Sequence, residues 1–247
     1  CGSALAEAEV EYDDRSSPAI DVAFPVADTA ALAKALGLPS LAEPAYAVIW
    51  TTTPWTLPAN EAVSVHPELT YDLVQTPVGL LILAQDLAEA AIKRYGYESV
   101  EVYATFKGAV LEHLKLRHPF YDKTVPLILG EHVTLEAGTG LVHTAPAHGL
   151  EDYVVGARYR LPVDNPVGDD GRFLPDRVGP GWLKGAFVLD ANETIVDDLR
   201  SRGLLLRRDP CSHTYPHCWR CKNPMLFRPT PQWVISLNPG GLLGGVV

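Results

Sequence analysis

The apolar positions of this chain fall into short runs that are rich in β-branched and aromatic residues and are bounded by proline, glycine or aspartate. Such short runs are typical of β-strands, because an amphipathic helix needs about ten or more residues in a 3.6-residue period. The pattern therefore predicts strands at residues 45–50, 62–65, 71–75, 80–84, 100–106 and 126–129.

Helical patterns are fewer. Asp28 is well placed to cap a helix of alanine and leucine that ends at Gly37. Residues 87–95 and 193–202 predict two more helices, the second of which ends before Gly203. Many short strands with few helices fit poorly to a wound sheet of alternating strands and helices. We predict an α+β fold in which a mixed, mostly antiparallel sheet curls toward a barrel and the helices are peripheral.

The character of the sequence changes twice along the chain. Residues 1–17 are polar and offer few core side chains, residues 18–206 alternate apolar runs with turn signals, and residues 207–247 are rich in cysteine, histidine and proline before a glycine-rich end. We predict an N-terminal connector strand, a central domain, and a C-terminal connector with a Cys-rich knuckle and a flexible tail. The two chain ends together would form the connector.

The composition and net charge restrict the class of protein and the kinds of molecule that it could bind. Of the 247 residues, 47% are hydrophobic, which excludes disorder and allows a large core. A net charge of −10 makes it unlike a protein that holds a long nucleic-acid backbone, although a short contact with a nucleic-acid end is compatible with it. No apolar stretch approaches the roughly 20 residues that span a bilayer, and no secretory leader opens the chain. We expect a cytoplasmic protein, and the first residues indicate an internal fragment.

Residues 50–60 (WTTTPWTLPAN) form the first segment with chemical potential. The prolines remove backbone donors and fix φ, so a rigid loop at the end of a strand is expected. The threonine hydroxyls both donate and accept hydrogen bonds, which suits the orientation of a water molecule or a ribose hydroxyl. The same composition also fits an edge strand with a proline-stiffened turn, and both interpretations stay open.

Residues 138–153 (GTGLVHTAPAHGLEDY) form the second segment. His143, His148, Glu151 and Asp152 lie close together in sequence, beside a glycine turn that allows a ligand to approach. Gly149 marks the expected start of a helix, so the two acids could instead compensate the helix dipole, and His148 could be an ordinary loop histidine. Neither segment contains a Ser-His-Asp arrangement, a Walker loop or a dinucleotide-binding glycine motif.

Cys218 and Cys221 form a Cys-x-x-Cys knuckle. Thiolates with this spacing can supply half of a tetrahedral zinc site. The candidates for the other half are Cys1, Cys211, His213 and His217. The crowding of three cysteines does not resemble a secreted disulfide scaffold, so thiols without metal in a reducing cytoplasm are the alternative.

Together, these segments resemble the editing (CP1) insertion of bacterial-type isoleucyl-tRNA synthetases, which are class I aminoacyl-tRNA synthetases. The resemblance runs from residues 3–12 (SALAEAEVEY) through residues 213–220 (HTYPHCWR) to residues 230–233 (TPQW), and residues 237–247 depart from the family. Leucyl and valyl relatives carry Thr-Thr-Arg-Pro where this chain has TTPW at residues 52–55.

The resemblance implies proofreading: hydrolysis of valine from tRNA(Ile), with valyl-adenylate as a second candidate substrate. The implied partners are the tRNA 3′ end, valine as the rejected amino acid, and the catalytic core of the same polypeptide. The ATP-binding signatures of the synthetic site are absent, so ATP and Mg belong to the full-length enzyme. Editing itself would require no cofactor, and a structural zinc in the Cys-x-x-Cys connector is the one candidate metal.

The resemblance also implies roles for single residues. Asp152 would hold the α-ammonium of the substrate as a charge-assisted acceptor. Thr51, Thr52 and Thr53 would shape the pocket, contact the terminal adenosine and position the attacking water, and His143 would form the wall that excludes a longer side chain. Further candidates for lining the substrate site are Trp50, Asn60 and His148. The alternative function is a non-catalytic module that positions the tRNA 3′ end and carries a zinc-knuckle connector.

Overall fold

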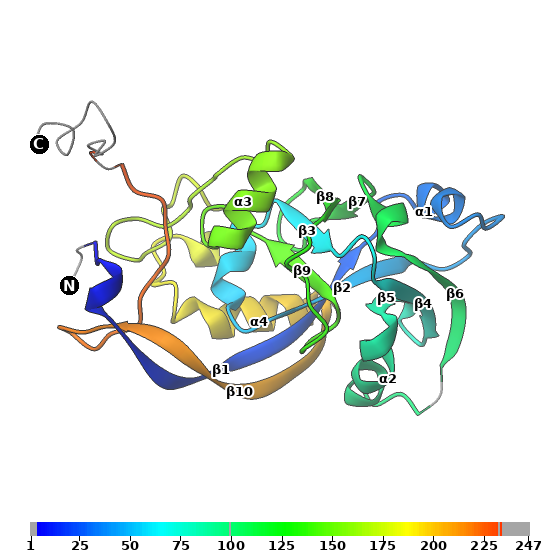
Figure 1. Cartoon of the computed structure of the whole chain (residues 1–247), viewed down its shortest axis with the longest axis horizontal. Helices are drawn as coiled ribbons and strands as arrows, with labels where there is room; N and C mark the ends of the chain where they lie inside the picture. The colour runs from blue at the N-terminus through cyan, green and yellow to red at the C-terminus, as the bar shows by residue number, and fades with distance from the viewer. Residues whose placement is uncertain (1–3, 99, 232, 234–247) are drawn as a thin grey trace, which may run out of the picture.

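The computed structural model describes residues 4–98, 100–231 and 233, which form two mixed sheets and a few short helices. Figure 1 shows a long two-stranded ribbon, β1 (Val10–Pro25) with β10 (Leu205–Cys218), that leaves the body of the molecule on one side. The ribbon strands continue into the body, so the ends of the chain are joined to its centre.

Two of the strand pairs, β2–β5 and β3–β8, are parallel, and the other ladders are antiparallel. The six-stranded sheet has the order β10 (Leu205–Cys218), β1 (Val10–Pro25), β2 (Ala45–Thr51), β5 (Gly79–Ala84), β4 (Thr70–Thr76) and β6 (Glu101–Lys107). The four-stranded sheet has the order β7 (Lys115–Arg117), β8 (Thr124–Leu129), β3 (Ala62–Val65) and β9 (Leu141–Thr144). The described strands do not close into a barrel.

The helices begin and end where local chemistry predicts. The Asp28 carboxylate accepts hydrogen bonds from the first turn of α1, and Gly37 and Gly203 take positive φ values of 68° and 69° after α1 and α4. The α-helices are α1 (Thr29–Ala35), α2 (Gln85–Arg94), α3 (Leu150–Arg158) and α4 (Ala191–Ser201). The 3₁₀ turns are η1 (Glu7–Glu9), η2 (Pro54–Ala59), η3 (Gly108–Leu111) and η4 (Gly181–Leu183). Within the described part of the chain, each helix is too short or too polar to cross a bilayer.

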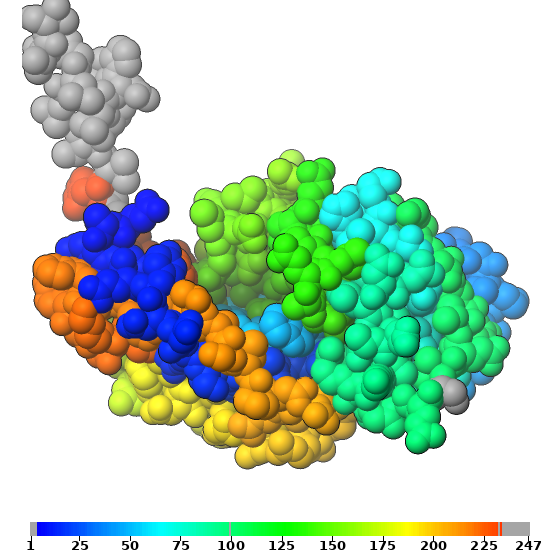
Figure 2. All heavy atoms as spheres, turned by 60° about the horizontal axis from the view of Figure 1, so that its bottom comes forward, coloured from blue at the N-terminus to red at the C-terminus, as the bar shows by residue number. Residues whose placement is uncertain are grey.

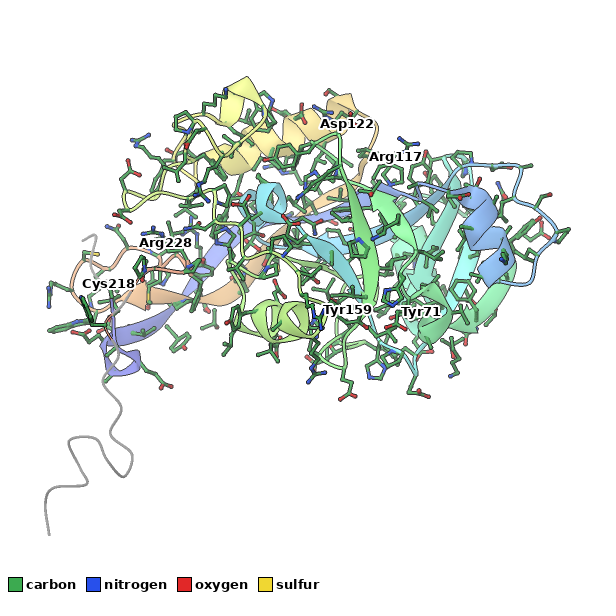
Figure 3. The ribbon with its side chains drawn as sticks, turned by 90° about the horizontal axis from the view of Figure 1, so that it is seen from above. Tyr71, Arg117, Asp122, Tyr159, Cys218 and Arg228 are labelled. Carbon is green, nitrogen blue, oxygen red and sulfur yellow. The ribbon has the colours of Figure 1, made fainter. Side chains whose placement is uncertain are left out.

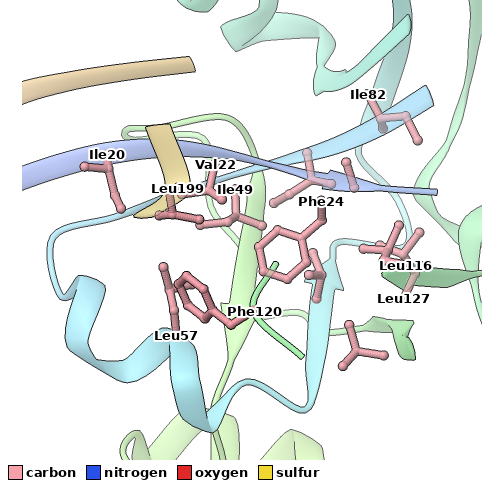
Figure 4. Packing of buried hydrophobic residues seen from close by; sticks show 14 of the residues in the cluster. Ile20, Val22, Phe24, Ile49, Leu57, Ile82, Leu116, Phe120, Leu127 and Leu199 are labelled. Carbon is pink, nitrogen blue, oxygen red and sulfur yellow. The ribbon is translucent and has the colours of Figure 1, made fainter. Parts of the chain in front are cut away.

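The main core lies between the two sheets and is closed by α4. Phe24 of β1, Leu57 of η2, and Leu116 and Leu127 of the smaller sheet are fully buried there (Figure 4). Leu199 of α4 covers the same cluster. The turn that follows β2 is therefore anchored in the core by its own leucine.

The predicted α+β class, with mixed and mostly antiparallel strands, is confirmed, but the described strands form two open sheets rather than one sheet curled into a barrel. The segments expected to form the connector pair with each other as β1 and β10. The sequence pattern missed how far β1 and β10 extend, because their outer halves pair with each other in an exposed ribbon that needs no apolar alternation. Both strands run without a break through the predicted boundaries at 17/18 and 206/207, and the division of the chain stays a prediction. Cys1 and the tail 237–247 lie outside the described residues.

A buried ion pair fixes α2 against β1. Asp21 is 2% exposed and accepts hydrogen bonds from Arg94 Nε (3.1 Å), Arg94 Nη2 (2.7 Å) and the Tyr95 hydroxyl (2.9 Å). Burial raises the pKa of Asp21, and the guanidinium of Arg94 opposes that rise. Asp21 lies opposite Trp50 in the β1–β2 ladder, so this pair holds the strand from which the threonine loop emerges.

We expect Arg94→Met to lower the free energy of unfolding by about 3 kcal/mol at pH 8, because it leaves the Asp21 carboxylate buried without its cation. The pKa of Asp21 in the folded variant would rise further, so the folded chain takes up a proton as the pH falls and the deficit shrinks toward pH 4. Urea unfolding at both pH values measures this. Lys93→Met removes the neighbouring exposed cation as a control, and equal losses in the two variants would contradict the prediction.

Candidate active site

The threonine loop begins where β2 ends at Thr51. The Thr53 N–H donates to Thr51 Oγ1 at 3.1 Å, and the Thr51 and Thr53 hydroxyl oxygens lie 3.2 Å apart. Pro54 occupies the start of η2, where a missing N–H costs nothing. Thr56, one 3₁₀ turn after Thr53, donates its hydroxyl proton to the Thr53 carbonyl at 2.9 Å. The loop thus presents connected hydroxyls on one side.

The glycine turn brings the second segment beside this loop. Gly138 and Gly140 have φ values of 84° and 75°, and an added Cβ would lie 2.8 Å from Trp50 Cβ at Gly138 and 2.2 Å from Ala84 Cβ at Gly140. Only glycine fits such positions. The turn feeds β9, which pairs with β3 so that His143 lies opposite Val63.

Asp152 lies in the first turn of α3, but its carboxylate turns back toward the preceding loop. Its Oδ2 accepts a hydrogen bond from the Ala145 N–H at 3.0 Å. Burial raises the pKa of Asp152 to about 6; the Ala145 N–H opposes this rise, and the charge of Glu151 adds to it. Glu151 is exposed. Dipole compensation therefore describes Glu151 well, whereas Asp152 is available to a ligand.

His143 joins the two segments. Its Nε2 lies 2.9 Å from Thr56 Oγ1. With the Thr56 hydroxyl donating to the Thr53 carbonyl, the imidazole Nε2–H is the donor and Nδ1 carries a lone pair, and we assign this tautomer. His143 Nδ1 is buried and has no hydrogen-bond partner among the described residues. Burial lowers the pKa of His143 to about 4, with a smaller contribution from His148, so the ring is neutral at pH 7.

These groups surround one cavity of about 240 Å³. Figure 2 shows a hollow in the middle of its face, with light-blue atoms of the segment around residue 50 in its floor and green atoms on its rim. The lining residues are Trp50, Thr51, Thr53, Thr56, Val142, His143, Ala145, His148, Gly149 and Asp152.

The cavity contains most, but not all, of the site residues expected from the sequence. Those that it brings together are Trp50, Thr51, Thr53, His143, His148 and Asp152. Thr52 and Asn60 do not line it; Asn60 is fully buried, and its Nδ2 donates to the Ala62 carbonyl at 2.7 Å. Thr56 was missed, although its position three residues after Thr53, next to a proline, was a usable sign of a shared face.

A larger groove of about 380 Å³ follows α1 and the residues after it, but it lacks comparable chemistry. Among the described residues that line it, Lys34 is the one charged side chain, and the others are small, apolar or hydroxyl-bearing. The smaller cavity is therefore the better candidate for catalysis.

The Cys-x-x-Cys knuckle lies at the far end of the ribbon. Cys218 ends β10, and the Lys222 N–H closes a tight turn onto the Cys218 carbonyl at 2.8 Å. The Asn223 N–H, followed by the Cys218 thiol, lowers the pKa of Cys221 to about 7.

The other candidate zinc ligands do not complete a site with Cys218 and Cys221 among the described residues. Cys211 and His213 lie farther back along β10, and at a rise of ~3.3 Å per residue they are too distant to share an ion with Cys218. His217 Nδ1 lies 2.8 Å from the Tyr215 carbonyl. Cys1 lies outside the described residues, and within them no group of three or more His, Cys, Asp or Glu could hold a metal ion.

The sequence is similar to bacterial isoleucine–tRNA ligases. It is 58% identical over 242 residues to the ligase of Dechloromonas aromatica and 56% identical over 247 residues to that of Thiobacillus denitrificans, which covers 96% and 100% of this chain. The chain spans 26% of the length of each of these curated relatives. No protein-family model matches the sequence.

The fold is similar to solved editing domains of another synthetase. A crystal structure described as GlLeuRS-CP1 superposes with a TM-score of 0.61 at 14% identity and covers 77% of this chain and 98% of that one. The editing domain of the P. knowlesi cytosolic leucyl-tRNA synthetase superposes with a TM-score of 0.57 at 9% identity and covers 77% of this chain and 96% of that one. The chain is therefore similar to a segment of bacterial isoleucine–tRNA ligases, and its fold is similar to that of solved leucyl-tRNA synthetase editing domains.

Proposed function

We propose that this chain is the proofreading hydrolase of an isoleucyl-tRNA synthetase and that it releases valine from the 3′ end of tRNA(Ile). Valyl-adenylate is a second substrate in the proposal. One observation carries it: the hydroxyl loop and Asp152, which are far apart in the sequence, line a single cavity in a chain similar to a segment of these ligases. That arrangement favours hydrolysis over a module that only positions the tRNA end.

The cavity offers acceptors that suit a charged amine. The Asp152 carboxylate and the unpartnered His143 Nδ1 both accept hydrogen bonds. A substrate α-ammonium brings three donors, and a charge-assisted bond to Asp152 would distinguish an aminoacyl ester from a plain ester. The hydroxyls of Thr51 and Thr53 would orient the water and the terminal ribose. Catalysis would then rest on positioning and carbonyl polarisation, without a covalent enzyme intermediate.

Steric exclusion would supply the selectivity. Binding alone discriminates weakly between side chains that differ by one methylene, because a methylene is worth only ~1–3 kcal/mol in an apolar pocket. Discrimination between isoleucine and valine is the standard example of this general limit. A second pocket that accepts valine and excludes isoleucine adds the missing discrimination. The His143 ring is held by Thr56 and by the β3–β9 ladder, so it would resist displacement by a longer side chain.

The rest of the longer polypeptide would hold the tRNA body. With a net charge of −10, this chain repels a phosphate backbone, and its relatives are about four times as long. The proposed partners are the catalytic core of the same polypeptide and the 3′ end of tRNA(Ile). The proposed location is the cytoplasm.

We also propose a structural zinc ion at the ribbon tip, supported by two thiols on one turn. Cys218 and Cys221 lie on one tight turn, and the lowered pKa of Cys221 favours the thiolate that zinc requires. These two thiolates would supply half of a tetrahedral site, with Cys1 as a candidate for the other half. The metal would stabilise the joined chain ends, and the proposed hydrolysis would proceed without a cofactor.

We expect Asp152→Asn to lower kcat/KM for release of valine from Val-tRNA(Ile) about ten- to hundredfold, because a hydrogen bond to a charged group is worth ~1.5–3 kcal/mol. Glu151→Gln removes the adjacent exposed carboxylate and serves as the matched control. Initial rates of deacylation measure both. Equal effects of the two substitutions would remove Asp152 from the site.

The value of kcat/KM should fall as the pH drops below about 6. The α-ammonium requires an ionised Asp152, whose pKa in the free chain is raised to about 6, so binding is strong above that pH and weak below it. A pH profile of single-turnover deacylation at subsaturating Val-tRNA(Ile) tests this. A profile that stays flat from pH 7 to 5 would exclude the assignment.

His143→Ala should open the wall and raise the rate of hydrolysis of correctly charged Ile-tRNA(Ile), by at least tenfold, while valine release changes less. Removing the ring leaves space where an isoleucine side chain would otherwise collide. The ratio of the two deacylation rates is the measurement. An unchanged ratio would place the size filter elsewhere.

A further inference from the structure

The two ring nitrogens of His148 differ in their hydrogen bonding: Nδ1 has a partner, and Nε2 has none among the described residues. Nδ1 lies 2.8 Å from the carbonyl oxygen of Phe227, in the segment that returns from the ribbon tip. A carbonyl only accepts, so Nδ1 carries the proton, and in the neutral ring Nε2 carries a lone pair. Nε2 is buried and has no hydrogen-bond partner among the described residues, while the ring lines the cavity.

The ring is held from two sides. Trp55 of η2 meets it edge-on, with ring centroids 5.0 Å apart and an interplanar angle of 66°. The segment that carries Phe227 is tied down by the ion pair of Arg228 with Asp169, at 2.7 Å. Figure 3 shows Arg228 between the ribbon tip, marked by Cys218, and the body of the molecule. The lone pair on Nε2 is therefore pre-positioned, which is a requirement for proton transfer.

The surroundings keep His148 neutral. Burial lowers its pKa, the Phe227 carbonyl opposes this, and the positive charge of Arg228 lowers the pKa further. The titratable groups that face it are Arg228 from the returning segment, His143 from β9 and Asp152 from α3. At pH 7 the ring is thus an unprotonated base.

The other candidate bases in the cavity are less suitable. His143 is more deeply buried and, with its pKa lowered to about 4, is a weak base. One carboxylate oxygen of Asp152 accepts a hydrogen bond from the Ala145 N–H. In the proposed function, the negative charge of Asp152 binds the α-ammonium of the substrate. The threonine hydroxyls do not accept a proton at neutral pH.

We propose that His148 is the general base of this site and takes the proton from the attacking water on Nε2; this inference rests on the proposed function. The water oxygen forms a bond to the ester carbonyl carbon as one of its protons moves to Nε2, and the carbonyl electron pair moves onto its oxygen. When that pair returns, the bond to the ribose oxygen breaks and this oxygen takes the proton from Nε2. The products are the free amino acid and a ribose hydroxyl.

The decisive variant is His148→Gln, which keeps a polar planar group but cannot carry a proton. We expect kcat for valine release to fall by about a hundredfold or more, with KM within about threefold, because general-base catalysis contributes ~10²–10⁴. The kcat of the wild-type chain at saturating Val-tRNA(Ile) should decline at acid pH, and the variant should lose that limb. A kcat within threefold of wild type with the same limb overturns the inference.

A second pair of variants tests the base without removing it. Arg228→Met takes away a nearby positive charge, so the His148 pKa rises and the acid limb of kcat moves to higher pH, while the plateau falls because the ion pair with Asp169 that ties down the Phe227 segment is also lost. Arg228→Lys keeps the charge and should leave the limb in place. A limb that does not move in Arg228→Met overturns the inference even if His148→Gln fails to fold.

The wild-type chain separates the two proposals. If it releases no valine, the proposed function is wrong, and the role of His148 falls with it. If it releases valine and the His148 and Arg228 variants behave as wild type, the proposed function stands and the general base lies elsewhere.

Discussion

The hydrogen bond between His143 Nε2 and Thr56 Oγ1 is the contact on which the site depends. It joins the loop after β2 to β9, two elements that belong to different sheets. In the tautomer that we assign, the Thr56 hydroxyl donates to the Thr53 carbonyl and His143 Nε2 carries the proton. This assignment links one local 3₁₀ turn to a histidine far along the chain and leaves His143 Nδ1 as an acceptor without a partner among the described residues.

Several hydrogen-bond acceptors line the cavity. Asp152, His143 Nδ1 and His148 Nε2 all present acceptors, and burial keeps both imidazoles neutral. Buried acceptors without donors are costly, so the free cavity is poised for a ligand that brings N–H and O–H groups. An amino acid ester with its α-ammonium, together with one water molecule, supplies such groups, whereas an uncharged ester would leave Asp152 unsatisfied.

The sequence was informative where side chains determine local structure. The Asp28 cap, the glycines after α1 and α4, and the short apolar strands all follow from local chemistry. The ribbon was not predictable in this way, because β1 and β10 are stabilised there by backbone pairing between distant ends. Within the site, the sequence indicated the threonine loop and Asp152, but Asn60 turned out to bond inward to Ala62, which no pattern of residue types reveals.

The role of His148 required the folded chain for a further reason. A histidine in a loop has no fixed tautomer until a partner is known, and here the partner is a main-chain carbonyl contributed from beyond the Cys-rich turn. The ribbon brings that segment back to the cavity, and the ion pair of Arg228 with Asp169 holds it there. The ribbon and the segment that returns from its tip therefore do more than extend the six-stranded sheet. Because they hold the proton on one nitrogen of His148, any movement of the ribbon tip that carried Phe227 away would free the imidazole to change its tautomer, and the lone pair would no longer be directed into the cavity.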